Sequence, residues 1–155
     1  MNAVRIQLLM TGSELMSGTT VDSNSARMAD ALATLGMAVQ RKVTVGDDLA
    51  LLVHEIQAIS QQADVLVING GLGPTSDDLT AQALADATND TLVENAEALA
   101  RLQQWCEQRG MALNAANRKQ ACLPSTSFLV PNPVGSAVGF GVKWRDCLII
   151  CTPGI

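Results

Sequence analysis

The sequence is poor in aromatic and in positively charged residues. Aromatic side chains make up 3% of the 155 residues, tyrosine is absent, and histidine occurs once. The formal net charge is −5. Proteins that bind nucleic acid normally offer a basic surface and aromatic rings on which bases stack. Because this chain is short of both, we expect it to have no nucleic-acid partner.

Long apolar stretches and a leader peptide are also missing. The longest apolar runs, such as residues 65–68, are short and bounded by polar residues, whereas a membrane helix needs about 20 apolar residues. The first residues, MNAVRIQLLMTGSE, are typical of a strand and lack the basic start and cleavage site of a signal peptide. We therefore predict a cytoplasmic protein that does not bind a membrane.

Cysteine is present, but not in a pattern typical of disulfides or metal sites. Cys106, Cys122, Cys147 and Cys151 form no Cys-x-x-Cys pair, and no histidine lies near them in the sequence. In a chain without a secretion signal, this usage predicts reduced, buried thiols.

Strand and helix patterns alternate along the chain, and nothing resembles a linker or a repeat. Hydrophobic residues make up 48% of the chain and charged residues 16%, which is typical of one globular domain. The patterns predict strands at 4–11, 37–45, 64–69, 138–144 and 147–152. They predict helices at 22–35, from 47 or 48 through 59, from 77 or 78 to 87, at 94–109 and at 114–121. This order predicts an α/β domain with a mostly parallel sheet and one antiparallel hairpin strand near the end.

The chain stops directly after a predicted strand and turn, at residues 151–155 (CTPGI). We interpret residues 1–155 as a single domain that is truncated at its C-terminal end. On this interpretation the last predicted strand would leave an open sheet edge.

Polar clusters follow the first three predicted strands. They are residues 11–14 (TGSE), 46–48 (GDD) and 70–78 (GGLGPTSDD). The carboxyl ends of parallel strands share one edge of the sheet, and open α/β sheets bind their ligands there. The loop at residues 132–136 (NPVGS) is a fourth segment that is expected to close over the same place.

The glycine-rich loop favours a phosphate site. Gly70, Gly71 and Gly73 carry no side chains that would block a ligand, so backbone N–H groups of the loop and of the next helix can face an anion. The alternative is a plain strand-to-helix turn in which Asp77 or Asp78 is the N-cap. No lysine follows the glycines as in a Walker A loop, and the spacing is not Gly-x-Gly-x-x-Gly.

Carboxylates are crowded at the same predicted edge. Glu14, Asp47, Asp48, Asp77 and Asp78 all fall in these clusters. Helix caps explain one acidic residue for each helix, but explain two doubled aspartates less well. Carboxylates beside a phosphate need a cation between them, and Mg²⁺ is usually held by one or two carboxylates together with substrate phosphates. The sequence therefore predicts a site for phosphate and metal together.

Other candidate residues carry weaker signals. His54 lies in the middle of a predicted helix, where a solvated histidine is the simpler interpretation. The Arg118-Lys119 pair is interpreted either as a phosphate contact or as a solvated helix face. Ser13, like the neighbouring serines, has no histidine at a spacing that suggests a Ser-His triad.

Five motifs follow one another along the chain, namely TGSELMSGTTVDSNS, VTVGDD, NGGLGPTSDDLT, NRKQACLP and PNPVGSAVGF. In this order they resemble the N-terminal domain of CinA-like proteins (competence/damage-inducible protein A). That domain is itself similar to the molybdopterin-binding domains of the MogA and MoaB type. The resemblance covers nearly the whole chain and implies a three-layer α/β/α fold with a pocket for a nucleotide or pterin phosphate.

The resemblance also implies an activity. CinA-type domains hydrolyse the pyrophosphate bond of ADP-ribose with a divalent metal, and potassium is a second implied cofactor. The chain would then be a hydrolase that acts on ADP-ribose or a related nucleotide, and we expect it to form a homo-oligomer.

Roles are implied residue by residue where the motifs match. The implied catalytic residues are Asp78 and Asp47, and the implied metal ligands are Asp78, Asp47 and Glu14. The implied substrate- and phosphate-binding residues are Gly70, Gly71, Gly73, Thr75, Thr80, Asn24, Asn132, Pro133, Gly135 and Ser136.

The chain departs from the family pattern in two places. The family usually has Thr where Ser13 stands, and it has a Thr-Pro-Gly-Val-Pro turn with further chain where this sequence ends at residues 152–155. There is also no room for the C-terminal amidohydrolase domain that many CinA proteins carry.

Two other functions stay open at this point. One is a molybdopterin-binding or adenylyl-transferring relative, and the other is a nucleotide-binding and oligomerisation module that has lost its chemistry.

Overall fold

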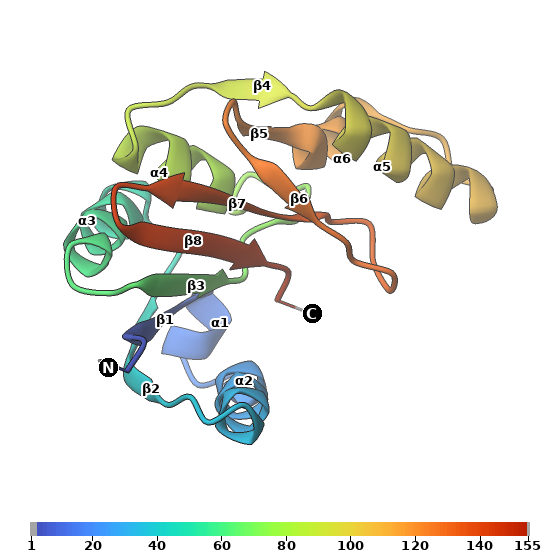
Figure 1. Cartoon of the computed structure of the whole chain (residues 1–155). Helices are drawn as coiled ribbons and strands as arrows, with labels where there is room; N and C mark the ends of the chain where they lie inside the picture. The colour runs from blue at the N-terminus through green and yellow to red at the C-terminus, as the bar shows by residue number, and fades with distance from the viewer. Residues whose placement is uncertain (1–2, 155) are drawn as a thin grey trace.

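A six-stranded sheet forms the centre of the computed structural model, which describes residues 3–154 (Figure 1). Its strand order is β2-β1-β3-β8-β7-β6. The strands are β1 (Ile6–Thr11), β2 (Val39–Val45), β3 (Val65–Asn69), β6 (Phe128–Val130), β7 (Gly139–Trp144) and β8 (Cys147–Thr152). All neighbours pair in parallel except that β7 is antiparallel to both β8 and β6. The expected mostly parallel sheet with one antiparallel strand is confirmed.

Helices and a small second sheet surround this centre. The helices are α1 (Ser13–Met16), α2 (Ser23–Thr34), α3 (Leu49–Ser60), α4 (Thr80–Ala87), α5 (Ala96–Gln108), α6 (Ala115–Arg118) and the 3₁₀ helix η1 (Lys119–Ala121). The second sheet pairs β4 (Leu92–Glu94) with β5 (Cys122–Pro124) in antiparallel fashion. The sequence patterns did not predict this pair.

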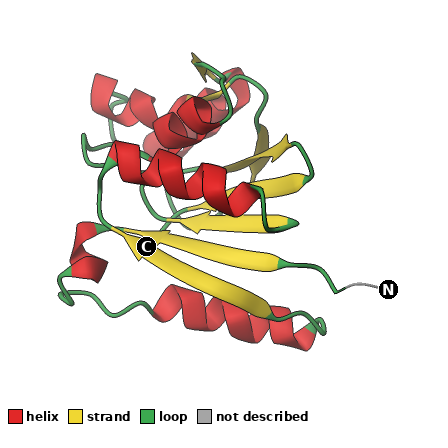
Figure 2. Cartoon of the chain, turned by 90° about the vertical axis from the view of Figure 1, so that its left-hand side faces the viewer, coloured by secondary structure: helices red, strands yellow, loops and turns green. Residues whose placement is uncertain are grey.

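The hydrophobic core lies between the sheet and helices α3 and α4. Leu52, Ile56 and Ile59 of α3 are almost fully buried and form one cluster with Leu66 and Ile68 of β3. The three α3 residues recur at helical spacing, whereas the two β3 residues alternate as strand residues do. Helices lie on both sides of the sheet in Figure 2, which gives the three layers that the sequence led us to expect.

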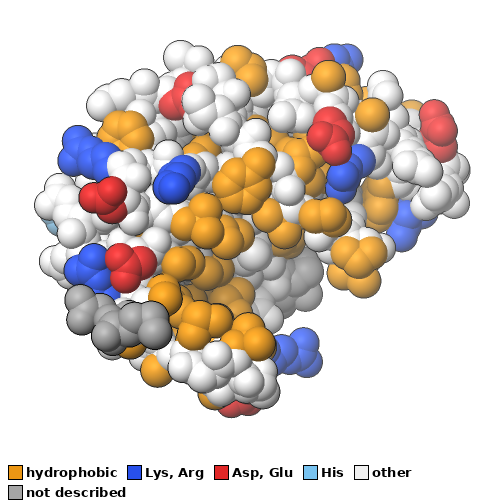
Figure 3. Space-filling view, in the orientation of Figure 1, with side chains coloured by type: hydrophobic (Ala, Val, Ile, Leu, Met, Phe, Trp, Pro, Cys, Tyr) orange, Lys and Arg blue, Asp and Glu red, His pale blue; other side chains and the backbone are white. Residues whose placement is uncertain are grey.

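The second face of the sheet is covered over only part of its width. Helices α1 and α2 contact β2 on that side. In the middle of the sheet, Val65 and Val67 of β3 are only half-buried, and so are their β8 partners Leu148 and Ile150. Figure 3 shows hydrophobic side chains gathered in a band across this face, over β3, β8 and β7. We call the four residues Val65, Val67, Leu148 and Ile150 the open face.

Two helices begin at an aspartate that caps them, close to the predicted helix starts at 22 and at 47 or 48. The Asp22 side chain accepts a hydrogen bond from Ser25 N at the start of α2, and Asp48 accepts one from Leu51 N at the start of α3. Helix α5 begins two residues later than predicted, because Glu94 belongs to β4 and Asn95 is the N-cap.

The predicted start of α4 at 77 or 78 is wrong, and so is the alternative in which one of these aspartates is its N-cap, because α4 begins at Thr80. Leu79 occupies the N-cap position and makes no side-chain cap, so neither Asp77 nor Asp78 caps this helix. The physical reason is that the Asp78 carboxylate accepts hydrogen bonds from the N–H and the hydroxyl of Thr75. That carboxylate closes a turn within the loop, and the helix begins only after it.

The last strand is not an open edge, contrary to expectation. Strand β8 pairs with β3 on one side and with β7 on the other. The chain crosses from β3 through α4, the small sheet and α5 before it returns by way of β6 and β7, so its final strand inserts into the interior of the sheet. The outer strands are β2 and β6.

The thiols match the expectation of reduced cysteines. Cys106, Cys147 and Cys151 are buried, Cys122 is half-buried, and all four are free. Burial raises the pKa of the Cys147 thiol to about 11 and raises that of Cys151 further. A thiol is nucleophilic only as a thiolate, so these two are structural groups. Within residues 3–154, no helix is both long enough and apolar enough to cross a membrane.

Candidate functional site

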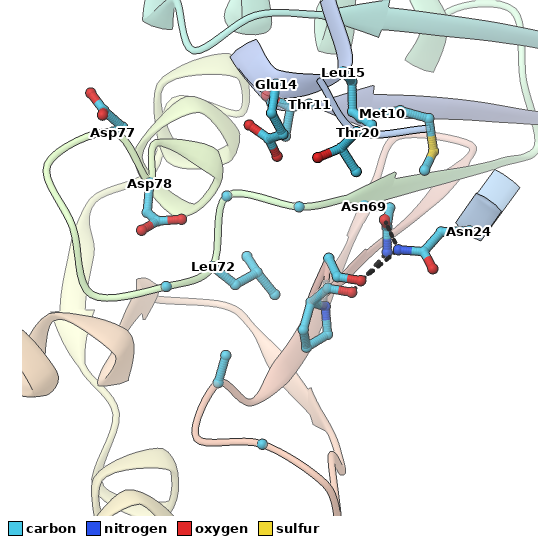
Figure 4. A pocket seen from close by; sticks show the side chains of 18 of the residues that line it. Met10, Thr11, Glu14, Leu15, Thr20, Asn24, Asn69, Leu72, Asp77 and Asp78 are labelled. Atoms are coloured by element: carbon cyan, nitrogen blue, oxygen red, sulfur yellow. Dashed lines mark hydrogen bonds between the residues drawn. The ribbon is translucent and has the colours of Figure 1, made fainter. Parts of the chain in front are cut away.

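A pocket of about 780 Å³ opens at the carboxyl ends of the parallel strands (Figure 4). Thr11 ends β1, Asp47 follows β2, Gly70 follows β3 and Pro153 follows β8, and all four line the pocket. The volume lies within the range of roughly 300–1,000 Å³ that is usual for small-molecule sites. The expected meeting of the three polar clusters at one sheet edge is confirmed.

The glycine loop, residues 70–78, is fixed from beneath by Thr80. The Thr80 hydroxyl is buried and donates to the carbonyl of Gly70 at 2.7 Å. Gly71 has a φ of 73°, and a β-carbon on it would overlap the Thr80 hydroxyl. Gly70 and Gly71 line the pocket, whereas Thr80, which was expected to bind phosphate, lies outside the pocket lining and supports the loop.

Three consecutive backbone donors of this loop are free for a ligand. The N–H groups of Gly71, Leu72 and Gly73 have no acceptor among the residues that the structure describes. The Leu72 side chain is buried in the core and anchors this stretch. Successive unpaired N–H groups in a turn form a concave site that attracts anions, so the loop fits the phosphate site that was expected.

Asp78 is held in one position by its own loop. Its Oδ2 accepts from Thr75 N at 2.9 Å and from Thr75 Oγ1 at 2.7 Å. A β-carbon on Gly73 would lie 2.8 Å from the same oxygen, so the carboxylate packs directly over that glycine. In Figure 4, Asp78 faces the pocket, whereas Asp77 points outward. The two adjacent aspartates are therefore not equivalent.

Lys119 holds the same loop from outside the pocket. Its ammonium donates to the carbonyl of Thr75 and, at 2.6 Å, to the carbonyl of Asp78. The neighbouring Arg118 instead pairs with Glu94 of β4, with a shortest distance of 2.8 Å. The sequence suggested either a phosphate contact or a solvated helix face for the Arg118-Lys119 pair. Lys119 has neither role, because it contacts carbonyls of the glycine loop more than 40 positions away.

Asp47 and Glu14 line the pocket from the segments that follow β2 and β1. Asp47 Oδ2 accepts from Ser13 Oγ at 3.1 Å and from Ser13 N at 3.3 Å, which ties the turn after β2 to the start of α1. Glu14 is exposed, and its carboxylate folds back over Gly12, where a β-carbon would lie 2.5 Å from Oε1. Both carboxylates line the pocket together with Asp78.

An asparagine pair closes the pocket at the end of β3. Asn69 donates through Nδ2 to Thr152 Oγ1 and to the carbonyl of Pro153, both at 2.8 Å. Asn24 of α2 donates to Asn69 Oδ1 at 3.0 Å and to the carbonyl of Gly154 (Figure 4). Asn24 lines the pocket as expected, but its amide N–H groups hold the turn after β8. The role of the buried Asn69 was missed, because its partners Asn24, Thr152 and Pro153 all lie at least 45 positions away in the sequence.

The fourth loop also reaches the pocket. Asn132 donates to the carbonyl of Ala137 at 2.8 Å, so the loop is braced by its own side chain. Asn132, Gly135 and Ser136 line the pocket, and Gly73 and Thr75 line it from the glycine loop. Pro133, which was expected among the substrate-binding residues, lies outside the lining and is exposed.

The pocket lining is acidic. Five of its residues are acidic, namely Glu14, Asp22, Asp47, Asp77 and Asp78, while none is lysine, arginine or histidine. The side chain of Asp77 points outward (Figure 4). A phosphate that enters such a pocket is repelled unless a cation comes with it.

The three implied metal ligands do not form a preformed metal centre. Among residues 3–154, no three His, Cys, Asp or Glu side chains are close enough together to hold an ion. A Mg²⁺-like ion is commonly held by one or two carboxylates together with phosphate oxygens and water. Asp78, Asp47 and Glu14 all line the pocket, and carboxylates are the side chains that such an ion takes as ligands.

Solved structures with the same fold include proteins from several lineages. The CinA protein of Thermoplasma acidophilum superposes with a TM-score of 0.89 at 30% identity, over 97% of this chain and 89% of that one. The molybdopterin biosynthesis enzyme MoaB of Thermus thermophilus superposes with a TM-score of 0.64 at 16% identity, over 98% and 82% of the two chains.

Curated relatives are longer than this chain. A CinA-like protein of Colwellia psychrerythraea is 57% identical over all 155 residues, which span 36% of that relative. A protein of Shewanella oneidensis named nicotinamide-nucleotide amidohydrolase PncC is 43% identical over 152 residues, again 36% of its length. The chain therefore spans about a third of the curated relatives it matches.

The fold and the pocket define an α/β domain with a pocket at the carboxyl ends of its parallel strands, where a glycine loop and carboxylates line the same cavity. The sequence model of one family, described as a probable molybdopterin binding domain, matches residues 7–155. The chain belongs to this family, and within it to the CinA-like proteins.

Proposed function

We propose that this domain binds a nucleotide through its diphosphate and hydrolyses the pyrophosphate bond of ADP-ribose or a related nucleotide with the help of a divalent metal. One observation carries the proposal: the loop that has three free N–H groups also holds the fixed carboxylate of Asp78, which packs against Gly73, in a pocket whose lining contains acidic and no basic residues. Donors for phosphate and carboxylates for a cation thus meet at one place.

The charge of each group decides which part of the ligand it binds. The N–H groups of Gly71, Leu72 and Gly73 are suited to phosphate oxygens. The carboxylates of Asp78, Asp47 and Glu14 are suited to a divalent cation, and potassium is the proposed second ion in the same acidic pocket. When bound, a divalent ion neutralises phosphate charge and makes a bound water more acidic.

Asp78 is the residue best placed to act on water. Thr75 occupies Oδ2, which leaves Oδ1 of the same carboxylate for another partner. In the proposed reaction, the water oxygen bonds to phosphorus while the bridging P–O bond breaks. The water gives its proton to Asp78 Oδ1, and the products from ADP-ribose are AMP and ribose 5-phosphate. A base of this kind contributes about 10²–10⁴-fold in rate.

The first experiment compares Asp78→Asn with Asp77→Asn. ADP-ribose is offered with Mg²⁺, Mn²⁺ or EDTA, and AMP is measured by chromatography. We expect release of AMP that needs the metal, a loss of about 10²–10⁴-fold in Asp78→Asn, and near-normal rates in Asp77→Asn, because Asp77 points outward. An Asn at position 78 can still accept from Thr75, so both variants are expected to fold. Equal activity of the two variants would show that Asp78 is not the base.

A second candidate function is the binding of a molybdopterin or the transfer of an adenylyl group to one. It is favoured by the description of the matching family as a probable molybdopterin binding domain and by the same pocket, which offers donors for a pterin phosphate. Quenching of pterin fluorescence on titration with the protein tests it. The amidohydrolase name belongs to a relative of which this chain spans 36%, and we do not carry it over to this pocket.

We also propose that the chain forms a homo-oligomer. The support is the open face, where four neighbouring apolar side chains remain half-buried in the single chain. If the pocket proves to lack turnover, a nucleotide-binding and oligomerisation module is the function that remains.

A further inference from the structure

One side chain of the pocket has a buried polar atom without a partner. Gln120 of η1 lines the pocket and is 8% exposed. Its Nε2 donates to Ser136 Oγ at 3.0 Å, whereas its Oε1 has no hydrogen-bond partner among residues 3–154. A buried amide oxygen without a donor is destabilising, so an unpaired one calls for an explanation.

The hydrogen bond to Ser136 orients the Gln120 amide but uses only its nitrogen. It joins η1 to the fourth loop, and the amide oxygen is left without a partner among residues 3–154. If the amide were turned over, the oxygen would accept from Ser136 and the nitrogen would be left unpaired instead. In either orientation, the hydrogen bond between η1 and the fourth loop gives a partner to only one of the two polar atoms of the amide.

The position of Gln120 indicates which part of a ligand would reach it. The preceding residue, Lys119, holds the glycine loop through the carbonyls of Thr75 and Asp78. Ser136, the partner of Gln120, belongs to the fourth loop, which lines the same pocket. The segment of Lys119 and Gln120 thus contacts the glycine loop on one side and the fourth loop on the other, so a ligand that bound the glycine loop through its phosphates would have Gln120 nearby for its remaining part.

The chemistry of an amide oxygen decides what it recognises. It accepts hydrogen bonds, so it pairs with O–H or N–H groups and not with phosphate oxygens, which are acceptors themselves. We propose that Gln120 Oε1, oriented by Ser136, is a specificity-determining acceptor for a neutral donor on the nucleoside part of the ligand, either a ribose hydroxyl or an amino group of the base. This inference rests on the proposed function, because it names the part of the nucleotide that the pocket selects.

The test measures affinities by calorimetry, in the absence of turnover, for ADP-ribose and for inorganic pyrophosphate. Gln120→Met keeps the length of the side chain but removes both polar ends. We expect it to weaken ADP-ribose binding by about 3- to 10-fold, as for one neutral hydrogen bond, and to leave pyrophosphate binding unchanged. Because an unpaired acceptor is removed, the melting temperature without ligand should stay equal or rise. The exposed Gln103→Met on α5 is the matched control and should change nothing.

Nucleotide analogues locate the donor. ADP is compared with its 2′-deoxy and 3′-deoxy forms and with IDP, in which an oxygen replaces the amino group. The analogue that lacks the relevant donor should bind wild type more weakly and be indifferent to Gln120→Met.

Three results would overturn the inference. One is that Gln120→Met lowers the melting temperature and weakens the binding of ADP-ribose and of pyrophosphate equally, which would show that Gln120 only stabilises the structure. Another is unchanged ADP-ribose affinity in Gln120→Met while wild type binds it well, in which case the proposed function survives. If wild type binds no nucleotide, the inference falls together with the proposed function.

Discussion

A substitution at Gly73 can move the Asp78 carboxylate without changing Asp78 itself. It does not need a positive φ, yet a β-carbon there would lie 2.8 Å from Asp78 Oδ2. Gly71 differs, because its φ of 73° and its contact with Thr80 tie it to the fold itself. Substitution of Gly71 would therefore mix a loss of stability with a loss of function.

We predict that Gly73→Ala displaces the Asp78 carboxylate and lowers the hydrolytic rate by about tenfold or more, since base catalysis depends on position. The melting temperature should change by only a few degrees, because the backbone angle suits alanine. Gly46→Ala is the control, since its β-carbon would meet Ser13 Oγ at an ordinary 3.5 Å. Unchanged activity in Gly73→Ala would mean that the position of Asp78 does not matter.

Lys119 provides a second test at the scale of single residues. Lys119→Met removes the donor to two carbonyls of the glycine loop. We expect the kcat/KM for ADP-ribose to fall about fivefold or more, as hydrogen bonds from charged donors are stronger than neutral ones, and Lys119→Arg to restore part of it.

Arg118→Met is the control for Lys119, because it breaks only the pair with Glu94. Equal losses in Arg118→Met and Lys119→Met would indicate general loosening of the region and not support of the loop.

At the scale of elements, Asp90 joins two turns around the small sheet. It accepts from Thr91 N at 2.7 Å and from Thr126 Oγ1 at 3.1 Å, and it also accepts from the hydroxyl of Ser125. The Ser125 hydroxyl is the main cause that holds the pKa of the Asp90 carboxyl below its ordinary value. Asp90 joins the turn after α4 to the turn between β5 and β6. The stability that this contact contributes therefore depends on pH, because it requires the charged carboxylate.

A carboxyl whose pKa is lower in the folded than in the unfolded state stabilises the fold fully above its unfolded pKa of about 3.9, and the contribution is lost as pH falls through the folded pKa. Asp90→Asn should therefore melt below wild type at pH 7, and this gap should narrow below pH 4. A gap that is equal at both pH values would show that the charge of Asp90 does not contribute.

Prediction from sequence succeeded for elements whose signals are local. The strands β3 and β8 are apolar runs, and Asp22 and Asp48 precede helical patterns as caps should. The strands β4 and β5 have three residues each, too few for a period to show, and one of them contains a proline. The start of α4 was misplaced because Asp78 has a competing partner in Thr75.

The site divides in the same way. The glycine loop and the fourth loop could be predicted, because each is a continuous motif whose composition limits its conformation. Lys119, Gln120 and Asn69 could not, since each acts on a segment that only the folded topology brings near. Their residue types are ordinary, and only burial and hydrogen bonding single them out.

At the scale of the whole molecule, the sheet has one protected edge and one unprotected face. Strand β2 is an outer strand whose middle carries the exposed residues Gln40, Arg41 and Lys42, and charged edges discourage strand addition. The open face presents four apolar side chains, with Lys143 as a charged neighbour opposite Leu148. Self-association is therefore expected through the open face and not through the β2 edge.

We predict that Leu148→Glu abolishes self-association while keeping the fold. Leu148 lies opposite Lys143 of β7 in the sheet register, so a glutamate there gains a cross-strand partner of opposite charge. The same carboxylate breaks the apolar surface that a second copy would have to bury, and charge at the centre of an interface is strongly unfavourable.

Sedimentation over a range of concentrations should show wild type associating and Leu148→Glu monomeric. Val93→Glu, an exposed position on β4, should associate as wild type does. If Leu148→Glu associates equally well at the same melting temperature, the open face is not the interface.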